Sequence, residues 1–110
     1  KVPTYRNPAE MIDEFRPQLV IIALPAHLSP ASIRRALEAG CHVLTEKPGC
    51  VRAEQFETLV KIASSKKRLL MLSLPSRVSP RSLRARQIIQ QGFLGKLFAV
   101  DVLQVKDQVG

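Results

Sequence analysis

The sequence has little of several residue types that would define a specialised class of protein. It contains no tryptophan, one tyrosine, 5 glycines and no low-complexity tract, while 45% of its residues are hydrophobic. These values exclude collagen, mucin-like and intrinsically disordered classes. The longest strongly apolar runs, Leu19–Leu24 and Leu69–Leu74, are far below the roughly 18 residues that a membrane-spanning helix needs. We therefore expect a folded chain with no transmembrane segment.

Cysteine is also scarce. Cys41 and Cys50 are too few for a disulfide framework, and their spacing to His27 or His42 matches no zinc-binding pattern. The opening residues lack the basic, apolar and small-residue zones of a signal peptide. The sequence therefore predicts two reduced thiols, no metal site and a cytoplasmic location.

Charge of one sign is in excess, since 17 lysines and arginines against 9 acidic residues give a net charge of +8. Basic residues at 66–68 and in the cluster 77–86 are candidates to neutralise the phosphates of a nucleic acid. The shortage of aromatic residues and the absence of a nucleic-acid motif disfavour that partner. An acidic remainder of a longer protein would also balance this charge.

Helix signals recur along the chain. Asn7 before Pro8 and Ser29 before Pro30 are typical of an N-cap followed by proline, and Gly40 is typical of a C-terminal stop. The predicted helices are Ala9–Phe15, Pro30–Ala39, Ala53–Ser65 and a fourth that Ser79 and Pro80 begin and Gly92 ends.

Apolar runs alternate with these helices. The predicted strands are Gln18–Leu24, His42–Thr45, Leu69–Leu74 and Lys96–Val105, and the continuous apolar run of the first predicts burial on both faces. Strands that alternate with short helices indicate right-handed crossovers and an open, largely parallel sheet. We therefore expect an α/β, partial Rossmann-like fold. Because the chain begins with a helix and ends on a strand, we expect a segment of a longer protein.

Ligands of such sheets bind outside the carboxyl ends of the strands. Two loops follow predicted strands at these ends, Pro25–Ser29 and Glu46–Pro48. Together with their spacing, they resemble a known family. The stretch VIIALPAHLSPASIRRALEAGCHVLTEKP, residues 20–48, is similar to the glucose-fructose oxidoreductase and inositol dehydrogenase (Gfo/Idh/MocA) family, and SRVSPRSLRARQIIQQGFLGKLFAV, residues 76–100, extends the likeness.

This resemblance implies an NAD(P)-dependent oxidoreductase with a Rossmann domain and a second α/β domain. Residues 1–95 would be the C-terminal part of the Rossmann domain, without its first βαβ unit, and residues 96–110 the first strand of the second domain. The sequence lacks the GxGxxG turn that cradles the pyrophosphate, so we expect the chain alone to be inactive. Relatives also imply a homo-oligomer.

The resemblance further implies roles for individual residues. Lys47 would be the catalytic residue that takes or gives the hydroxyl proton during hydride transfer, often within a cis Lys–Pro peptide. The residues that would contact NAD or NADP are Leu24, Pro25, His27, Glu46, Lys47, Pro48 and Arg77. Many members carry a histidine where this chain has Ser29, which is equally well explained as a helix N-cap.

Two classes of function follow from these residues. The first is a segment of a dehydrogenase that acts on a hydroxyl-bearing small molecule such as a sugar or polyol, which Lys47 favours. The second is a non-catalytic or truncated binding module, which the missing glycine turn and Ser29 favour. For Lys47 the plainer alternative is a solvated loop lysine paired with Glu46, and His42 is expected to be structural.

Overall fold

A computed structural model describes residues 2–103 of the chain. These residues belong to two compact units, Lys1–Leu74 and Pro75–Gly110, and each unit is described by itself. The predicted boundary between a domain of residues 1–95 and one of residues 96–110 concerns a longer protein and stays a prediction. None of the described helices is both long and apolar enough to cross a membrane.

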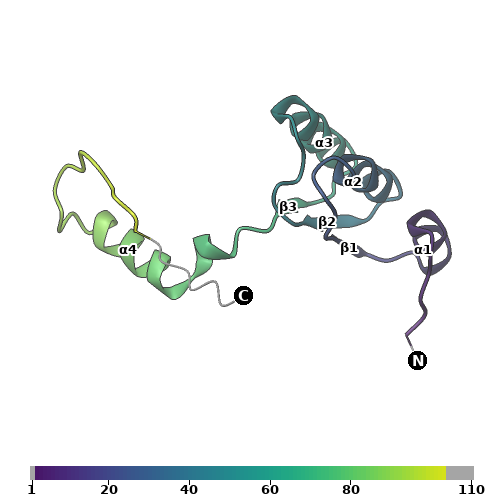
Figure 1. Ribbon diagram of the computed structural model, residues 1–110, viewed down its shortest axis with the longest axis horizontal. Coiled ribbons are helices and arrows are strands. Elements are labelled where there is room, and N and C mark those ends of the chain that lie inside the picture. The colour runs from purple at the N-terminus through teal and green to yellow at the C-terminus, as the bar shows by residue number, and fades with distance from the viewer. Residues whose placement is uncertain (1, 104–110) are drawn as a thin grey trace. The chain divides into compact units, whose positions relative to one another are not determined.

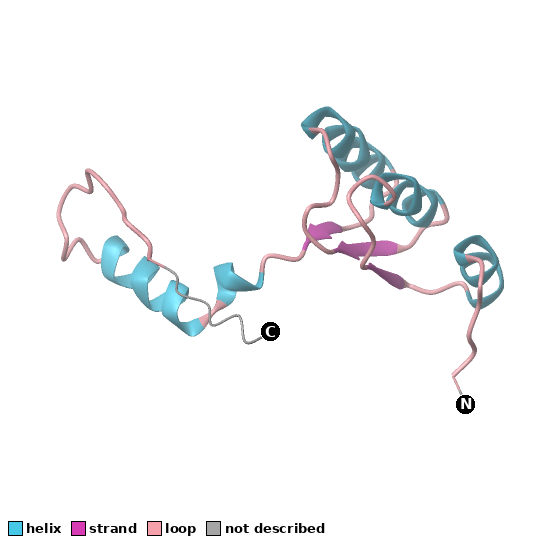
Figure 2. Ribbon diagram, viewed as in Figure 1, coloured by secondary structure: helices cyan, strands magenta, loops and turns pink. Residues whose placement is uncertain are grey.

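The first unit is an α/β layer built on a three-stranded parallel sheet of order β1-β2-β3. Helices α2 and α3 lie side by side on one face of this sheet (Figures 1 and 2), and α1 contacts α2. Its elements are α1 (Pro8–Phe15), β1 (Leu19–Ile22), α2 (Ser29–Glu38), β2 (His42–Thr45), α3 (Ala53–Ser65) and β3 (Leu70–Leu72). The predicted partial Rossmann-like class is confirmed.

Local sequence explains where the helices begin and end. The Asn7 side chain accepts a hydrogen bond from the backbone N–H of Ala9 at 2.9 Å, which caps α1 as predicted. Gly40 ends α2 with a φ of 84°, a conformation that glycine adopts at no steric cost. The strands β1 and β3 are shorter than the predicted strands, because Ala23, Leu24 and Leu74 have no register partner on a neighbouring strand.

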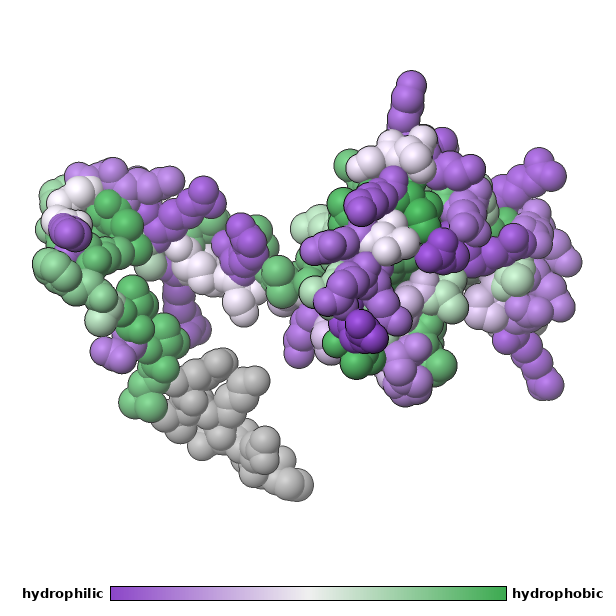
Figure 3. Space-filling view, turned by 90° about the horizontal axis from the view of Figure 1, so that it is seen from above, coloured by the Kyte–Doolittle hydropathy of each residue, from purple (hydrophilic) through white to green (hydrophobic). Residues whose placement is uncertain are grey.

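The core lies between the sheet and its covering helices. Its largest fully buried side chains include Ile33 and Leu37 of α2, Leu59 of α3 and Val43 of β2. Viewed from above, the helix-covered side of this unit presents mostly hydrophilic residues to solvent (Figure 3). The apolar stripes of α2 and α3 therefore face inward, as amphipathic helices require.

The opposite face of the sheet is uncovered within the described residues of this unit. Ile21, Leu44 and Met71 are register neighbours across the three strands, and Ile21 and Met71 are 67% and 61% exposed. The prediction that the first strand is buried on both faces is wrong for these residues, because α2 and α3 cover only the other face of the sheet (Figure 1).

The second unit holds a short 3-10 helix, η1 (Pro75–Val78), and α4 (Pro80–Gln90). Ser79 caps α4 by accepting from the backbone N–H of Ser82, as the sequence predicts. The predicted strand Lys96–Val105 is wrong over 96–103, where the backbone is irregular and Phe98 is 90% exposed. An apolar alternation becomes a strand only when a neighbouring strand satisfies its backbone. Residues 104 and 105 lie outside the described residues.

Candidate functional site

The loops after β1 and β2 emerge at the same edge of the sheet. Ile22 and Thr45 are register partners at the ends of these parallel strands, and the backbone N–H of Glu46 donates to the carbonyl of Ile22 at 2.8 Å. Two loops therefore leave adjacent strands at their carboxyl ends. The first contains Leu24, Pro25 and His27, and the second contains Glu46, Lys47 and Pro48. In open parallel sheets this edge is where ligands bind.

Ser29 organises the first of these loops. Its side chain is fully buried, and its hydroxyl donates to the carbonyls of Leu24 at 3.0 Å and Pro25 at 3.2 Å. The Pro25 carbonyl also accepts from the backbone N–H groups of Leu28 and Ser29. The N-cap role predicted for Ser29 is wrong, because Leu28 occupies that position and the serine is the first helical residue. The hydroxyl instead ties the strand end to α2.

In the second loop Lys47 is exposed to solvent, while the residues on either side of the exposed segment are buried. Lys47 and Pro48 are exposed and joined by a cis peptide, whereas Thr45 before them and Gly49 after them are buried. The Thr45 hydroxyl donates to the Glu46 carbonyl at 3.3 Å. Within residues 2–103, Lys47 forms no ion pair with Glu46. Of the plainer alternative, the solvated lysine is therefore observed and the pairing with Glu46 is not.

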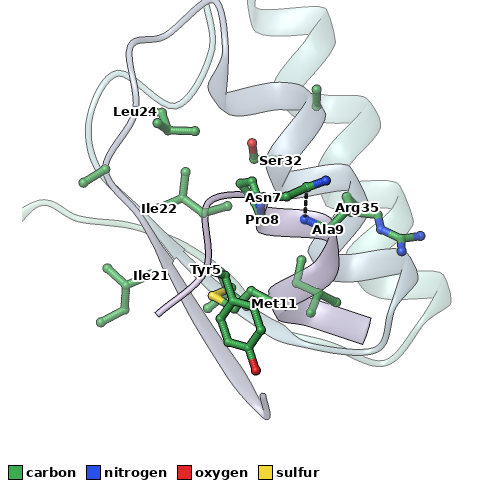
Figure 4. Close-up of a pocket in the computed structure, with 14 residues that line it drawn as sticks. Tyr5, Asn7, Pro8, Ala9, Met11, Ile21, Ile22, Leu24, Ser32 and Arg35 are labelled. Atoms are coloured by element: carbon green, nitrogen blue, oxygen red, sulfur yellow. Dashed lines mark hydrogen bonds between the residues drawn. The ribbon is translucent and has the colours of Figure 1, made fainter. Parts of the chain in front are cut away.

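A separate cavity of about 480 Å³ runs along β1, between α1 and α2 (Figure 4). Of the predicted site residues, only Leu24 lines it. Its walls are mainly apolar, with Tyr5, Met11 and Ile21 prominent among them. Arg35 lines one end but both Asp13 carboxylate oxygens accept from its guanidinium at 2.6 Å, so its charge is already balanced. The cavity lies along the strand and does not hold the predicted catalytic group.

His42 and the two cysteines are not part of the candidate site. The Nδ1 atom of His42 accepts from the backbone N–H of Leu69 at 3.0 Å, which confirms the structural role expected for it. Burial raises the pKa of the Cys41 thiol, with Arg68 opposing this in part, and burial also raises the pKa of the Cys50 thiol. Raised values favour protonated thiols of low nucleophilicity.

Several basic residues also have structural partners or face solvent. Arg68 donates from Nε to the carbonyl of Gly40, so one member of the basic tripeptide fastens α3 to the end of α2. Arg77 lies on η1 in the second unit and is exposed. The arginines of α4 are exposed as well, and Arg84 donates to Gln87 at 2.9 Å. The side chains of these arginines are therefore open to solvent in the described residues of the second unit.

Parallel strands joined by helical connections, with two loops converging at the carboxyl edge, are typical of a dinucleotide-binding type of α/β protein. The model of the oxidoreductase family with an NAD-binding Rossmann fold, Gfo/Idh/MocA, matches residues 1–74. The chain belongs to this family. The resemblance noted in the sequence and the assignment of NAD or NADP as the family's cofactor are thereby confirmed.

Individual relatives agree with this assignment. The chain is 35% identical to the NADP⁺-dependent D-xylose 1-dehydrogenase of Hypocrea jecorina, over 86% of the chain and 24% of that protein. It is similar to an NAD-binding oxidoreductase from Klebsiella pneumoniae (30% identity, TM-score 0.76, 83% of this chain and 24% of that one). It is also similar to scyllo-inositol dehydrogenase from Lactobacillus casei, solved with NAD(H) and scyllo-inositol (26%, TM-score 0.75, 82% and 27%). The chain thus spans about a quarter of the length of these relatives.

Proposed function

We propose that this chain is the part of an NAD(P)-dependent oxidoreductase that supplies the proton-transfer residue, Lys47, for hydride exchange with a hydroxyl-bearing substrate. The observation that carries the proposal is the position of the exposed Lys47 loop at the carboxyl end of β2, next to the loop after β1. The proposal extends to a domain boundary between residues 95 and 96 and to a cytoplasmic homo-oligomer.

The residues at this edge fit a dinucleotide. Leu24 and Pro25 are exposed directly after β1 and offer apolar surface, and His27 is exposed in the same turn. Glu46 and Pro48 flank the lysine in the loop after β2 and are exposed. We assign these five residues to cofactor contact. Arg77, on the second unit, is assigned to the same role from the sequence resemblance alone.

The chemistry requires two transfers from one carbinol group. The nicotinamide, when bound, supplies or accepts the hydride. Lys47 transfers the proton. As a free amine it accepts the hydroxyl proton while the C–O bond becomes a carbonyl, and as an ammonium it returns that proton in the reverse direction. The electron pair leaves with the hydride, so atoms and charge balance.

The substrate class is proposed from the names of the relatives. D-xylose and scyllo-inositol are both polyhydroxylated, one an aldose and the other a cyclic polyol. One of these relatives is named for NADP⁺ and the other holds NAD(H), so both cofactors belong in the assay. A sugar or polyol is therefore the substrate class that we propose.

The test is turnover by the full-length protein carrying Lys47→Ala. With D-xylose, myo-inositol and scyllo-inositol offered with NAD⁺ and NADP⁺, we expect the variant to lose about 10²- to 10⁴-fold in kcat. Lys61→Ala is the matched control, because Lys61 is an exposed lysine on α3, away from the strand ends. A Lys47→Ala variant that keeps the parent's kcat would contradict the proposal. Cofactor binding without turnover of any substrate would favour the non-catalytic module.

A further inference from the structure

Gly49 is enclosed directly below the loop that presents Lys47. It is buried, although Glu46, Lys47 and Pro48 before it are exposed. A Cβ atom added at Gly49 would lie 2.9 Å from Cε2 of Phe56. Real Cβ atoms essentially never approach another heavy atom within 3.0 Å. A methyl group at residue 49 would therefore require either the Phe56 ring or the loop to shift.

The walls around Gly49 belong to two different elements. Phe56 lies near the start of α3 and packs in part against the core. The second wall is Leu72, the last residue of β3, whose Cδ1 would lie 3.2 Å from the added Cβ. Directly after Leu72, the backbone N–H of Ser73 donates to the carbonyl of Thr45 at 2.8 Å, which holds the end of β3 against β2.

The loop is consequently fixed at two levels. At its start, the backbone N–H of Glu46 is hydrogen-bonded to β1, and the carbonyl of Thr45 is hydrogen-bonded to β3. At its base, Gly49 rests in contact distance of α3 and β3. Only Lys47 and Pro48 lie between these two anchors. A displacement of Gly49 therefore moves Lys47 as well, because the two residues are separated by a single residue.

We propose that Gly49 is a positioning residue for Lys47: the close seating of residue 49 against Phe56 and Leu72 sets where the lysine stands at the carboxyl end of β2. This inference rests on the proton-transfer role proposed for Lys47. The argument is steric, since a methyl group at this position displaces either the loop or the side chains of Phe56 and Leu72. Gly49 itself touches neither substrate nor cofactor in this proposal.

The size of the effect follows from the contact distances. An ordinary contact begins near 3.4 Å, so a methyl group at residue 49 must gain about half an ångström from the Phe56 ring. Misplacing a reacting group by 1 Å can cost about 10²-fold in rate. For a shift half as large, we expect kcat to fall about 10-fold, with the KM of substrate and cofactor close to the parent's values because binding contacts remain.

The experiment compares Gly49→Ala, Phe56→Leu and their combination in the full-length protein. The shorter leucine side chain removes the ring atom nearest to the new methyl group, so Gly49→Ala is expected to lose kcat alone and to regain it in the Phe56→Leu background. Val51→Ala is the control, since Val51 follows in the same loop and is 68% exposed. Thermal unfolding of each variant identifies a variant that is merely destabilised.

A second readout does not depend on turnover. Acetylation of Lys47 by acetic anhydride, followed by mass spectrometry with and without NADH or NADPH, reports whether the bound cofactor covers the amine. We expect the parent to show protection of Lys47, Gly49→Ala to lose part of it, and the double variant to regain it.

The outcomes separate the two proposals. Unchanged kcat and unchanged protection in Gly49→Ala would mean that the Phe56 ring yields to the methyl group, and the positioning role would be wrong. A loss that Phe56→Leu does not rescue, accompanied by a lower unfolding temperature, would also overturn it in favour of general destabilisation. If Lys47→Ala retains turnover, the proton-transfer role fails, whatever Gly49→Ala does.

Discussion

Replacing Ser29 with alanine removes the hydroxyl that ties the end of β1 to the beginning of α2. In the protein this hydroxyl is fully buried and donates to the carbonyls of Leu24 and Pro25. The Pro25 carbonyl retains two backbone donors after the change, whereas the hydroxyl of Ser29 is the one donor to the Leu24 carbonyl among the hydrogen bonds of the described residues. The loss of stability in Ser29→Ala therefore comes mainly from the Leu24 carbonyl, which loses its hydrogen-bond donor.

The magnitude follows from that count. Losing an ordinary hydrogen bond costs about 0.5–1.5 kcal/mol and leaving a buried polar group unpaired costs about 1–3 kcal/mol, and the partly buried bond to Leu24 lies between these two cases. Alanine has a higher helix propensity than serine by about 0.5 kcal/mol, which offsets part of this. We expect Ser29→Ala to lower the free energy of unfolding by about 1–2 kcal/mol, a factor of about 5 to 30 in the folding equilibrium.

Ser65→Ala provides the matched control for this prediction. Ser65 also lies at a helix end and donates to a backbone carbonyl, that of Ile62 at 2.8 Å, but it is exposed to solvent. Water replaces that bond, so we expect a loss within about 0.5 kcal/mol. Urea unfolding followed by circular dichroism measures both variants. If Ser29→Ala costs no more than Ser65→Ala, the burial argument is wrong.

Two further predictions concern the core and its thiols. Ile33 is 0% exposed and Ile21 is 67% exposed, so Ile33→Ala should cost about 2–5 kcal/mol and Ile21→Ala about 0.5 or less in thermal or urea unfolding; equal losses would place the core elsewhere. Burial raises the pKa of Cys41 above its ordinary value of 9.0. The unfolded thiol therefore ionises first, so its contribution to stability is complete below about pH 9 and is lost as the pH rises through the higher folded value. Unfolding measured between pH 8 and 10.5 should show this decline, and Cys41→Ala should flatten it; an equally steep decline in that variant would contradict the assignment.

The sequence predicted the paired elements better than the unpaired ones. The bounds of β2 and α3 agree with His42–Thr45 and Ala53–Ser65, because strong helix-end and strand signals flank both. The run at 96–103 has an equally good apolar alternation but forms no strand in the second unit. A strand depends on a partner that supplies its hydrogen bonds, and hydropathy along one segment carries no information about that partner.

Some features of the candidate site could likewise be predicted from the sequence, and others could not. The convergence of the two loops was predictable, because the carboxyl ends of parallel strands share an edge. The hydrogen bonds of Ser29 were not, since a serine before proline at a helix start has the same sequence pattern whether its side chain caps the helix or reaches back to the strand. The enclosure of Gly49 depends on Phe56 and Leu72, which lie 7 and 23 positions further along the chain.

The central place of β2 in the sheet has a consequence for motion. Both of its edges are hydrogen-bonded, to β1 and to β3, and both Val43 and Thr45 are almost completely inaccessible to solvent. Amides of such a strand exchange with solvent only when a large part of the unit opens, whereas exposed loops open locally. The lysine loop thus begins on the segment that opens least often, so the backbone that carries Lys47 keeps its place during the fluctuations of the surrounding chain.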